Sequence, residues 1–207
     1  MKKITLLTIA LLMGITAFAQ TTQLPQPNMQ RKTLTVMETF QQRKSVREYS
    51  ATPLSDQDLS DLLWAAQGQN RPDGHLTAPT AMNRQEISLY VFTAKGVSLY
   101  DPKSHSLKQV AEGDHRDMVA SRQDFAKTAP VCLVTVGDFG KFGSINEYAA
   151  MVAVDAGIVT QNIDLFCAAA GLATVPRATM DVQGIRSLLG LGENQVPIMN
   201  NPVGYMK

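Results

Sequence analysis

A cluster of cations occupies the stretch RKSVREY, residues 43–49. Arg43, Lys44 and Arg47 supply positive charge and Ser45 adds a hydroxyl donor, a combination that suits a phosphate or a similar anion. A structural interpretation is also available, because cations near the last turn of a helix interact favourably with its dipole and short basic runs are usually solvated surface. The stretch alone favours the structural interpretation, so the rest of the chain must decide what the cluster binds.

Familiar catalytic and metal-binding patterns are missing from the sequence. It contains no GxSxG, HExxH, Walker or CxxC motif. His75, His105 and His115 lie in separate segments without the spacing of metal ligands, so we predict no metal site. These features favour a bound cofactor that carries the reactivity itself, with the protein supplying binding, orientation and charge.

The N-terminal residues have the pattern of a secretory signal peptide. The chain begins with MKK, continues with an apolar stretch over residues 4–18, and offers AFA as a small-x-small cleavage site. The apolar stretch is short and contains threonines, which disfavours a membrane anchor. We therefore predict an exported chain, periplasmic or secreted, cleaved after Ala19. A flexible leader over residues 20–32 and one domain over residues 33–207 would follow.

The charge balance limits the possible partners, and the surroundings of the cysteines bear on whether they form a disulfide. With 19 basic and 18 acidic residues the formal net charge is +1, which provides no general field for nucleic acid or anionic membrane, and we expect neither as a partner of the mature chain. Cys132 and Cys167 both lie in apolar surroundings. Export would permit a disulfide between them, but buried free thiols are slightly favoured.

The elements that must position the cluster follow from hydrophobic periodicity and from helix and strand breakers. Ser55 is a good N-cap for a helix that Gly68 ends. A loop of about seventeen residues, 69–85, comes next, and loops of that length are often functional. The predicted class is α+β. Strands are predicted at 86–94, 97–100, 107–110, 130–136 and 196–203, the last interrupted by prolines, with further helices at 115–127 and 182–189.

The longest predicted element is a helix over residues 145–170. Its apolar positions alternate spacings of four and three and form a heptad seam, and further apolar residues lie off that seam. A helix that is apolar nearly all round is buried, which in so small a chain predicts packing on its own sheet and on a partner chain. Asp155, Gln161 and Asn162 interrupt this helix and need hydrogen-bond partners.

Four motifs, in order along the chain, resemble those of the FMN-dependent nitroreductases. RKSVREY is similar to the opening R-[RK]-S-x-R-x-[FY] motif, and LLWAAQGQNR followed by APTAMNRQ resembles a helix and the P-[ST]-x-x-N-x-Q flavin-binding loop. DAGIVTQNIDLFCAAAGLATV resembles the central dimer helix and PVGY the closing strand, so the resemblance covers about residues 36–207. It implies a nitroreductase-like fold, with a central, mostly antiparallel sheet flanked by helices and the long helix at a dimer interface.

The tryptophan-containing stretch WAAQGQNR and the insertion GVSLYDPKSHSL look most like the branch that contains the azoline-oxidising peptide dehydrogenases. That branch carries a Lys-Tyr pair ahead of the central helix as its proposed acid-base element. The matching place here has Lys141 followed by Phe142. A phenyl ring can neither donate nor accept a proton, so the pair lacks its phenol. Lys141 and Arg47 are the remaining catalytic candidates beyond the flavin.

The resemblance assigns an FMN site residue by residue. Arg43 and Ser45 match the positions that hold the phosphate, and Lys44 would add its charge or its backbone. Arg47 matches a cation beside N1 and the C2 carbonyl of the ring, where reduction leaves negative charge. Lys207 lies near the C-terminal cation that contacts the phosphate. The other matches are Asn83 and Gln85 at the polar edge of the ring, Pro79, Thr80, Ala81 and Met82 along that wall, and Val175, Pro176 and Arg177 behind the ring.

The resemblance also implies an activity and its partners. We expect a homodimer that shares two FMN sites and works in ping-pong order. A reduced donor such as NAD(P)H reduces the flavin and leaves, and a nitro, quinone or similar electrophilic acceptor then takes the electrons. NAD(P)H is expected to be scarce outside the cytoplasm, which leaves two alternatives open. One is an exported flavin-binding or sensing protein with little or no turnover, and the other is a flavin-free interaction module on the same scaffold.

Overall fold

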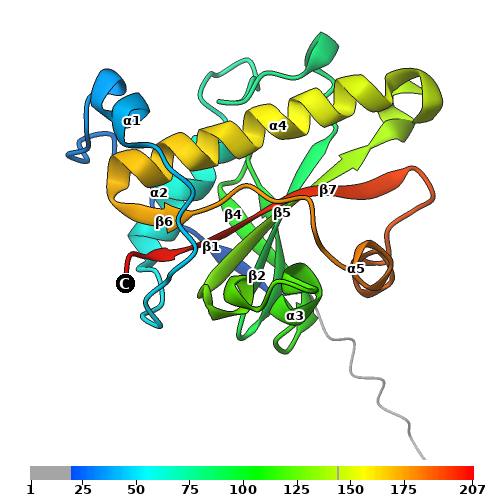
Figure 1. The fold of residues 1–207 in the computed structure, drawn as a ribbon. Coiled ribbons are helices and arrows are strands. Elements are labelled where there is room, and N and C mark those ends of the chain that lie inside the picture. The colour runs from blue at the N-terminus through cyan, green and yellow to red at the C-terminus, as the bar shows by residue number, and fades with distance from the viewer. Residues whose placement is uncertain (1–19, 144) are drawn as a thin grey trace, which may run out of the picture.

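A seven-stranded sheet forms the centre of the structure, a computed structural model that describes residues 20–143 and 145–207 (Figure 1). The strand order is β1-β4-β3-β2-β5-β7-β6, and every neighbouring pair is antiparallel. This confirms the predicted α+β class with its antiparallel sheet. The predicted signal peptide lies outside the described residues. The strands are β1 Thr21–Gln23, β2 Ile87–Thr93, β3 Gly96–Asp101, β4 Ser106–Glu112, β5 Val131–Asp138, β6 Leu172–Thr174 and β7 Gln195–Tyr205.

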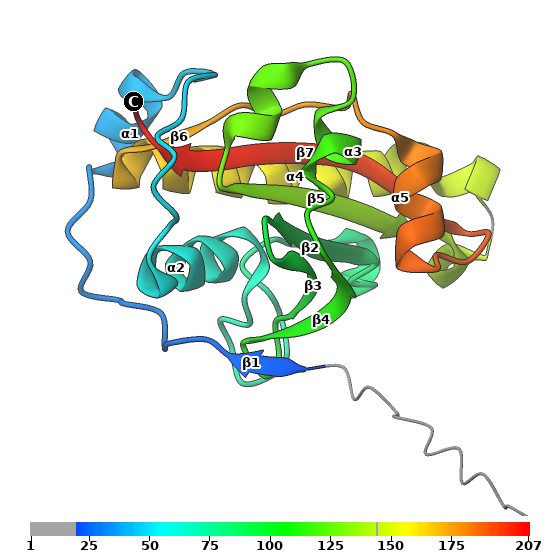
Figure 2. The ribbon, with the colours of Figure 1, turned by 90° about the horizontal axis from the view of Figure 1, so that it is seen from below.

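Helices cover both faces of this sheet (Figures 1 and 2). On one face α2 packs against α4, and α1 lies against the C-terminal part of α4; on the other face lie α3 and α5. Each face has its own core, with Leu62 and Ile163 fully buried in the first and Phe92 and Ile185 in the second. The helices are α1 Val36–Gln42, α2 Asp56–Gln67, α3 Arg116–Ala120, α4 Ile145–Ala170 and α5 Val182–Leu189, with the 3-10 turns η1 Ala81–Asn83, η2 Asp124–Thr128 and η3 Phe139–Phe142.

The helix α2 begins and ends where the sequence predicts. The hydroxyl of Ser55 accepts a hydrogen bond from the N–H of Asp58 (3.1 Å), which satisfies one of the free donors at the N-terminus. Gly68 follows the last turn, and its N–H donates to the carbonyl of Trp64 (2.7 Å). Leu63 and Ala66 on the inward face are fully buried, so the apolar periodicity identifies the side that packs on the sheet.

The long helix α4 carries the predicted seam. Val152, Val159 and Ile163 are fully buried against the sheet, whereas Met151 and Val154 on the opposite side are 43% and 59% exposed. Residues Tyr148–Ala170 are long and apolar enough to cross a membrane by length and composition, a property that core helices of soluble proteins share. The exposed apolar side is the surface that the sequence predicts for a partner chain.

The polar residues of α4 have the partners that burial requires. A carboxylate oxygen of Asp155 accepts from the N–H of Ala81 (2.8 Å). The side-chain amide of Asn162 donates to the carbonyl of Ala66 (3.3 Å), and Gln161 is exposed to solvent. Asp155 therefore connects α4 to η1, and Asn162 connects α4 to α2.

The two cysteines are free and buried on different sides of the sheet. Cys132 on β5 belongs to the core under α3 and α5, and Cys167 on α4 belongs to the core under α2 and α4. The sheet separates the two sulfur atoms, so the buried-thiol interpretation is confirmed and the disulfide alternative is wrong.

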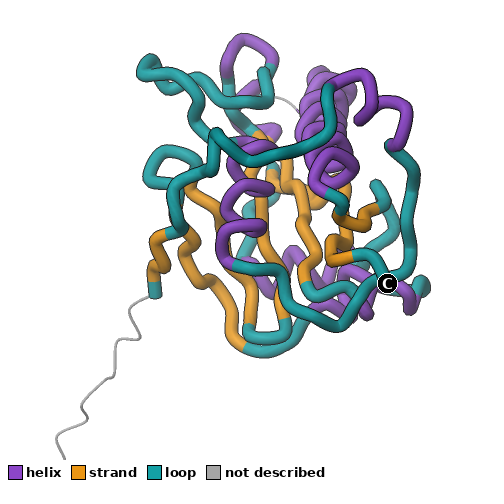
Figure 3. The backbone as a smooth tube through the Cα atoms, turned by 90° about the vertical axis from the view of Figure 1, so that its left-hand side faces the viewer, coloured by secondary structure: helices purple, strands orange, loops and turns teal. Residues whose placement is uncertain are grey.

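Residues 20–35, here called the strap, pack along the domain in this structure, in the segment where the sequence predicts a flexible leader over residues 20–32. β1 pairs with β4 at the sheet edge, and the strap then passes α2 on its way to α1 (Figures 2 and 3). Leu24 is buried, and Arg31 forms ion pairs with Asp58 (2.6 Å) and Asp61 (3.0 Å) of α2. Polar composition and two prolines disfavour a helix, but they permit an extended segment that pairs with an edge strand and an acidic helix face.

Two further boundaries differ from the prediction. The helix expected at 115–127 is α3 followed by η2, because Ser121 has a left-handed φ of 51° and ends the first helix. The last strand, β7, continues through both of its prolines. Pro197 lies at a register shift opposite Thr135 and Val136, where the ladder is already irregular and a missing N–H donor costs little.

Candidate functional site

The cation cluster, residues 43–47, begins where α1 ends. The N–H of Arg43 still donates to the carbonyl of Thr39 (2.9 Å), but a ψ of 120° turns the chain out of the helix. Arg43 is the C-cap residue of α1 and the other cations lie beyond the helix, so the helix dipole accounts for Arg43 at most. The chain then runs beside β6, where the N–H of Val46 donates to the carbonyl of Thr174 (2.8 Å).

The cluster presents charges that the protein leaves unpaired. Lys44, Ser45 and Arg47 are exposed and Arg43 is half-buried. Among the described residues, none of the three cations has a carboxylate within ion-pair distance. Tyr49 forms an antiparallel bridge with Met206, which places the C-terminal Lys207 next to the same stretch. Free cations around a hydroxyl fit a phosphate dianion, so the residues present here suit the phosphate of FMN.

A buried carboxyl, which the sequence analysis missed, lies beside the cluster. Asp164 on α4 is 4% exposed and accepts a hydrogen bond from the side-chain amide of Asn201 (2.9 Å). Burial raises the pKa of Asp164 to about 6, and the charge of Arg43 and the Asn201 hydrogen bond oppose that rise. A pocket of about 460 Å³ is lined by both Asp164 and Lys44. The carboxyl reduces the net positive charge of this region when it ionises.

The segment behind the predicted ring site meets the cluster at one aromatic ring. The guanidinium carbon of Arg47 lies 5.9 Å from the centre of the Phe125 ring, and that of Arg177 lies 5.4 Å from it. Arg177 follows Val175 and Pro176 directly, and Val175 is buried after β6. The structure therefore brings residues 43–47 together with residues 175–177, as the resemblance implies, and it adds Phe125 of η2, for which the sequence offered no signal.

Four hydrogen bonds hold the side chain of Arg177 inside the protein. Its guanidinium donates to the side-chain oxygens of Gln123 (2.8 Å) and Asn200 (2.7 Å) and to the carbonyls of Val119 (3.2 Å) and Ala120 (3.0 Å). Its backbone N–H and carbonyl both bond to Asn200. Burial lowers the pKa of Arg177 below its usual range. What this residue chiefly offers a cofactor is its positive charge, because most of its donors are occupied.

The predicted flavin-binding loop, residues 79–85, has an unusual backbone. Met82, Asn83 and Gln85 have φ values of 53°, 51° and 49°, a left-handed conformation that costs energy for residues with a side chain. The hydroxyl of Thr80 accepts from the N–H of Gln85 (2.9 Å), which closes the loop on itself. Met82 is 66% exposed and Asn83 is exposed, so the loop presents both side chains outward. Three such residues together indicate a conformation selected for function.

Three contacts fix this loop to the rest of the domain. The N–H of Ala81 donates to Asp155 of α4 (2.8 Å), and the ammonium of Lys141 donates to the carbonyl of Gln85 (2.6 Å). The side-chain amide of Gln85 donates to the carbonyl of Gly74 (2.9 Å). Lys141 thus supports the loop backbone in this structure, while its neighbour Phe142 stacks on the ring of Tyr148 at 5.0 Å.

The cluster and the loop lie against different parts of α4 in one chain. The loop contacts Asp155, whereas Arg43 lies near Asp164, nine residues further along the helix. That spacing corresponds to about 14 Å along the helix axis. Figure 1 shows η1 and α1 over separate stretches of α4. The contacts of a single chain therefore assemble residues 43–47 with 175–177 and leave 79–85 apart.

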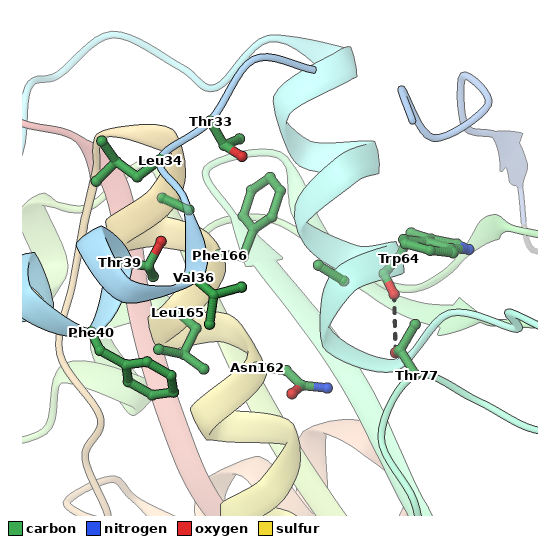
Figure 4. Close-up of a pocket in the computed structure, with 12 residues that line it drawn as sticks. Thr33, Leu34, Val36, Thr39, Phe40, Trp64, Thr77, Asn162, Leu165 and Phe166 are labelled. Atoms are coloured by element: carbon green, nitrogen blue, oxygen red, sulfur yellow. Dashed lines mark hydrogen bonds between the residues drawn. The ribbon is translucent and has the colours of Figure 1, made fainter. Parts of the chain in front are cut away.

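An apolar pocket of about 410 Å³ lies between α1, α2 and α4 (Figure 4). Val36 and Phe40 of α1 face Leu165 and Phe166 of α4 across it, and Thr77 donates to the carbonyl of Trp64 at its far side (3.2 Å). None of the predicted cofactor residues lines this pocket. It continues the exposed apolar surface of α1 and α4.

Comparison with known proteins decides the family. The model of the nitroreductase family matches residues 40–205. The chain belongs to the nitroreductase family. A nitroreductase-family protein of Methanocaldococcus jannaschii is 30% identical over 173 residues, which make up 78% of this chain and 86% of that protein. The crystal structure of a nitroreductase-family protein from Ralstonia eutropha is 33% identical, with a TM-score of 0.85 over 92% of this chain and 91% of the other.

Solved structures of lower identity show a likeness of fold alone. The NADPH:FMN oxidoreductase of Vibrio harveyi, solved with NAD+, has a TM-score of 0.62 at 23% identity, covering 83% of this chain and 69% of its own. The region matched by the nitroreductase model contains every predicted site residue except Lys207. In the part of the chain that the structure describes, no group of three or more His, Cys, Asp or Glu residues is placed to hold a metal ion.

Asp164 and Phe125, together with the buried Glu86 that directly follows the loop 79–85, are the residues beside the predicted site that sequence reasoning missed. A signal existed for Asp164, because it lies on the same apolar helix as Asp155 and interrupts it in the same way. Glu86 directly follows the flavin-loop motif, but as the first residue of a strand pattern it looked like a polar boundary. Phe125 became part of the site only through the break between α3 and η2.

Proposed function

We propose that this protein is an FMN-dependent oxidoreductase of the nitroreductase type. Membership of a family that generally uses FMN supports an oxidoreductase. The observation that most supports FMN as the cofactor is the cation cluster. Arg43, Lys44 and Arg47 lie next to Ser45 without carboxylate partners among the described residues. A protein exposes such a group of charges at a cost unless an anion uses them.

The residues divide into those that hold the cofactor and those that tune it. Arg43 and Ser45 would bind the phosphate with a planar donor fork and a hydroxyl, with Lys44 and Lys207 adding charge. Arg47 would place a cation at the polar edge of the ring. When bound, FMN would accept two electrons from a reduced donor such as NAD(P)H and pass them to a nitro, quinone or similar acceptor. The buried charge of Arg177 would favour the same electron-rich state from behind Phe125.

We also propose a homodimer that shares two FMN sites. In one chain the loop 79–85 lies apart from the cation cluster, so a second chain would have to supply one of them to each flavin. The apolar surface that a partner would cover is present. Val36, Met37 and Phe40 on α1 are 70%, 76% and 56% exposed, next to the exposed apolar side of α4. Neighbouring exposed apolar side chains of this kind mark surfaces that interact with other proteins.

We also propose export through the N-terminal signal peptide. Because NAD(P)H is expected to be scarce outside the cytoplasm, export leaves one alternative function open. An exported flavin protein with little or no turnover would have the same site but lack a donor. Azoline oxidation receives no support from Phe142, which stacks on Tyr148 and offers no proton. The acceptor class is therefore expected to be a small electrophile.

An anaerobic spectrum tests the activity. The mature chain is reconstituted with FMN, freed of excess, and titrated with NADH or NADPH, then with a nitroaromatic or a quinone. We expect the flavin absorbance near its oxidised maximum to bleach with one of the donors and to return with the acceptor. Flavin that binds but does not bleach with either donor would instead support the low-turnover alternative.

The division of labour within the cluster is a separate prediction. Arg43→Ala should weaken FMN binding by about tenfold to a hundredfold, because a charge-assisted hydrogen bond contributes about 1.5–3 kcal/mol. Arg47→Ala should bind FMN nearly normally and lower the flavin potential by about 30 mV or more, since 30 mV corresponds to about 1.4 kcal/mol for two electrons. Lys95→Ala, which removes an exposed cation in the β2–β3 turn, is the matched control. An unchanged potential in Arg47→Ala would refute the assignment.

A further inference from the structure

A pair of buried carboxyls lies directly behind the loop 79–85. Glu86 follows the loop and precedes β2, and its side chain is 0% exposed. Neither of its carboxylate oxygens receives a hydrogen bond from the described residues. Its carboxyl faces that of Asp155 on α4, which is 4% exposed. Two buried carboxylates in contact, with no donor between them, cannot both be ionised at an acceptable energy.

The charged groups around Glu86 come from two elements. Asp155 of α4 is the negative one and Lys141 of η3 is the positive one. The ammonium of Lys141 donates to the carbonyl of Gln85 (2.6 Å), and it acts on Glu86 only through its charge. Burial and the Asp155 carboxyl raise the pKa of Glu86 to about 7, against the opposing effects of the backbone N–H of Glu86 and, to a smaller degree, of the charge of Lys141. Glu86 therefore keeps its proton well above the pH at which an exposed glutamate loses it.

That proton completes a chain of contacts to the loop. A protonated Glu86 can donate to one oxygen of Asp155, and Oδ2 of Asp155 accepts from the N–H of Ala81 (2.8 Å). The main chain of Glu86 is itself fixed, because its carbonyl accepts from the N–H of Asp138 (2.9 Å). Asp155 is thus held between β2 and the loop. The left-handed residues Met82 and Asn83, next to Ala81, need such support to keep a costly conformation.

We propose that Glu86 and Asp155 are positioning residues, and that a proton held by Glu86 against Asp155 latches the loop 79–85 in the conformation that receives the flavin ring. When the pair loses the proton, the two carboxylates repel, Asp155 shifts or hydrates, and the Ala81 hydrogen bond opens. The affinity for FMN then decreases as the pH rises through neutrality. The latch itself belongs to the chain without cofactor, and only its effect on affinity rests on the proposed function.

The sign of the pH effect follows from linkage. Between the ordinary pKa of a glutamate and the raised pKa of Glu86, the folded protein holds a proton that the unfolded chain has released. Protonation of Glu86 therefore stabilises the fold fully at acid pH, and this stabilisation is lost as the pH rises toward and beyond about 7. Glu86→Gln, a neutral isostere that can still donate to Asp155, should remove this dependence.

Hydrogen exchange of the Ala81 amide in the flavin-free protein tests the latch. Wild type, Glu86→Gln and Asp155→Ala are compared at pH 6 and pH 8, with Glu193→Gln as a control that removes an exposed carboxylate. The protection factor of Ala81 in wild type should fall about tenfold between these pH values, because about a tenth of the pair keeps its proton one unit above a pKa of 7. Glu86→Gln should keep the high protection at both values, and Asp155→Ala should lose it at both.

Titration with FMN at the same two pH values separates this inference from the proposed function. The dissociation constant of wild type should rise about tenfold from pH 6 to pH 8, and that of Glu86→Gln by less than twofold. Protection that follows the pattern above, in a protein that binds no flavin, would support the latch and refute the function. Ala81 protection that is the same in wild type at pH 6 and pH 8 would overturn the latch, even if Glu86→Gln failed to fold.

Discussion

The guanidinium of Arg177 is buried among four neutral oxygens, from Gln123 just before η2, from α3 and from β7, and no carboxylate of the described residues pairs with it. The sequence resemblance placed this residue at the flavin, and the structure shows that its hydrogen bonds hold three elements together. Both roles are compatible, because a buried cation acts on its surroundings through its field while its donors remain occupied. Its removal would leave Asn200 and two carbonyls without their donors.

Replacement of Arg177 by lysine should therefore destabilise the fold. A lysine keeps the charge but cannot reproduce the planar fork, so at least two acceptors lose their partners, at about 1–3 kcal/mol each. We expect the free energy of unfolding to fall by about 2–4 kcal/mol in urea titrations. Arg71→Lys, at an exposed position, is the control and should leave stability unchanged. Normal stability with weakened FMN binding would instead make Arg177 a direct ligand.

At the residue scale, the sequence indicated the exposed groups that are candidates for binding a cofactor, and it did not indicate the buried groups that support them. Arg43, Ser45 and Arg47 could be found because a cation cluster with a hydroxyl is visible as a motif. Glu86 could not, since a single acidic residue at the start of a strand normally lies in solvent, and only the approach of α4 buries it. Burial of a charged side chain depends on tertiary contacts that no local pattern contains.

At the element scale, the strap is held to α2 and the β3–β4 hairpin by a buried histidine. Nδ1 of His105 accepts from the hydroxyl of Tyr100 (2.8 Å), and Nε2 lies 2.7 Å from the hydroxyl oxygen of Ser60 and 3.0 Å from the carbonyl of Pro25 in the strap. An imidazole that is protonated only on Nε2 satisfies all three partners. Burial lowers the pKa of His105, in keeping with a neutral ring.

Acid should weaken this attachment. Below the ordinary histidine pKa the unfolded chain binds a proton that the folded His105 resists, so the stabilisation is full above about pH 6.5 and is lost as the pH falls. His105→Gln should be less stable than wild type at pH 7 by about 1–2 kcal/mol, and the difference should shrink at pH 5. His115→Gln is the control. A difference that grows toward pH 5 would contradict the neutral ring.

Most elements could be predicted from the sequence, and the failures share one cause. The capped helix α2, the seam of α4 and the buried strand β5 follow from local periodicity, and the structure confirms them. The strap and the break at Ser121 do not, because both depend on partners far away in the sequence. The strap becomes an edge strand only where β4 offers free backbone groups, and the chain leaves α3 at Ser121 so that η2 can pack beside Arg177.

At the scale of the whole molecule, the predicted flavin residues form two groups on opposite stretches of α4. One group joins the cation cluster to residues 175–177 around Phe125, and the other is the loop 79–85 with its carboxyl latch. The apolar side chains of α1 and of the outer side of α4 are themselves exposed to solvent. A second chain on that surface would complete each site, so cofactor binding and assembly are expected to depend on each other.

The central claim is that the cation cluster holds the phosphate of FMN, and riboflavin, which lacks that phosphate, tests it most directly. Equilibrium titrations compare FMN with riboflavin in wild type, Arg43→Ala and the control Lys95→Ala. We predict that wild type and the control prefer FMN by about a hundredfold or more, and that Arg43→Ala loses most of this preference while its affinity for riboflavin stays unchanged. Equal affinities of wild type for the two flavins would contradict the account.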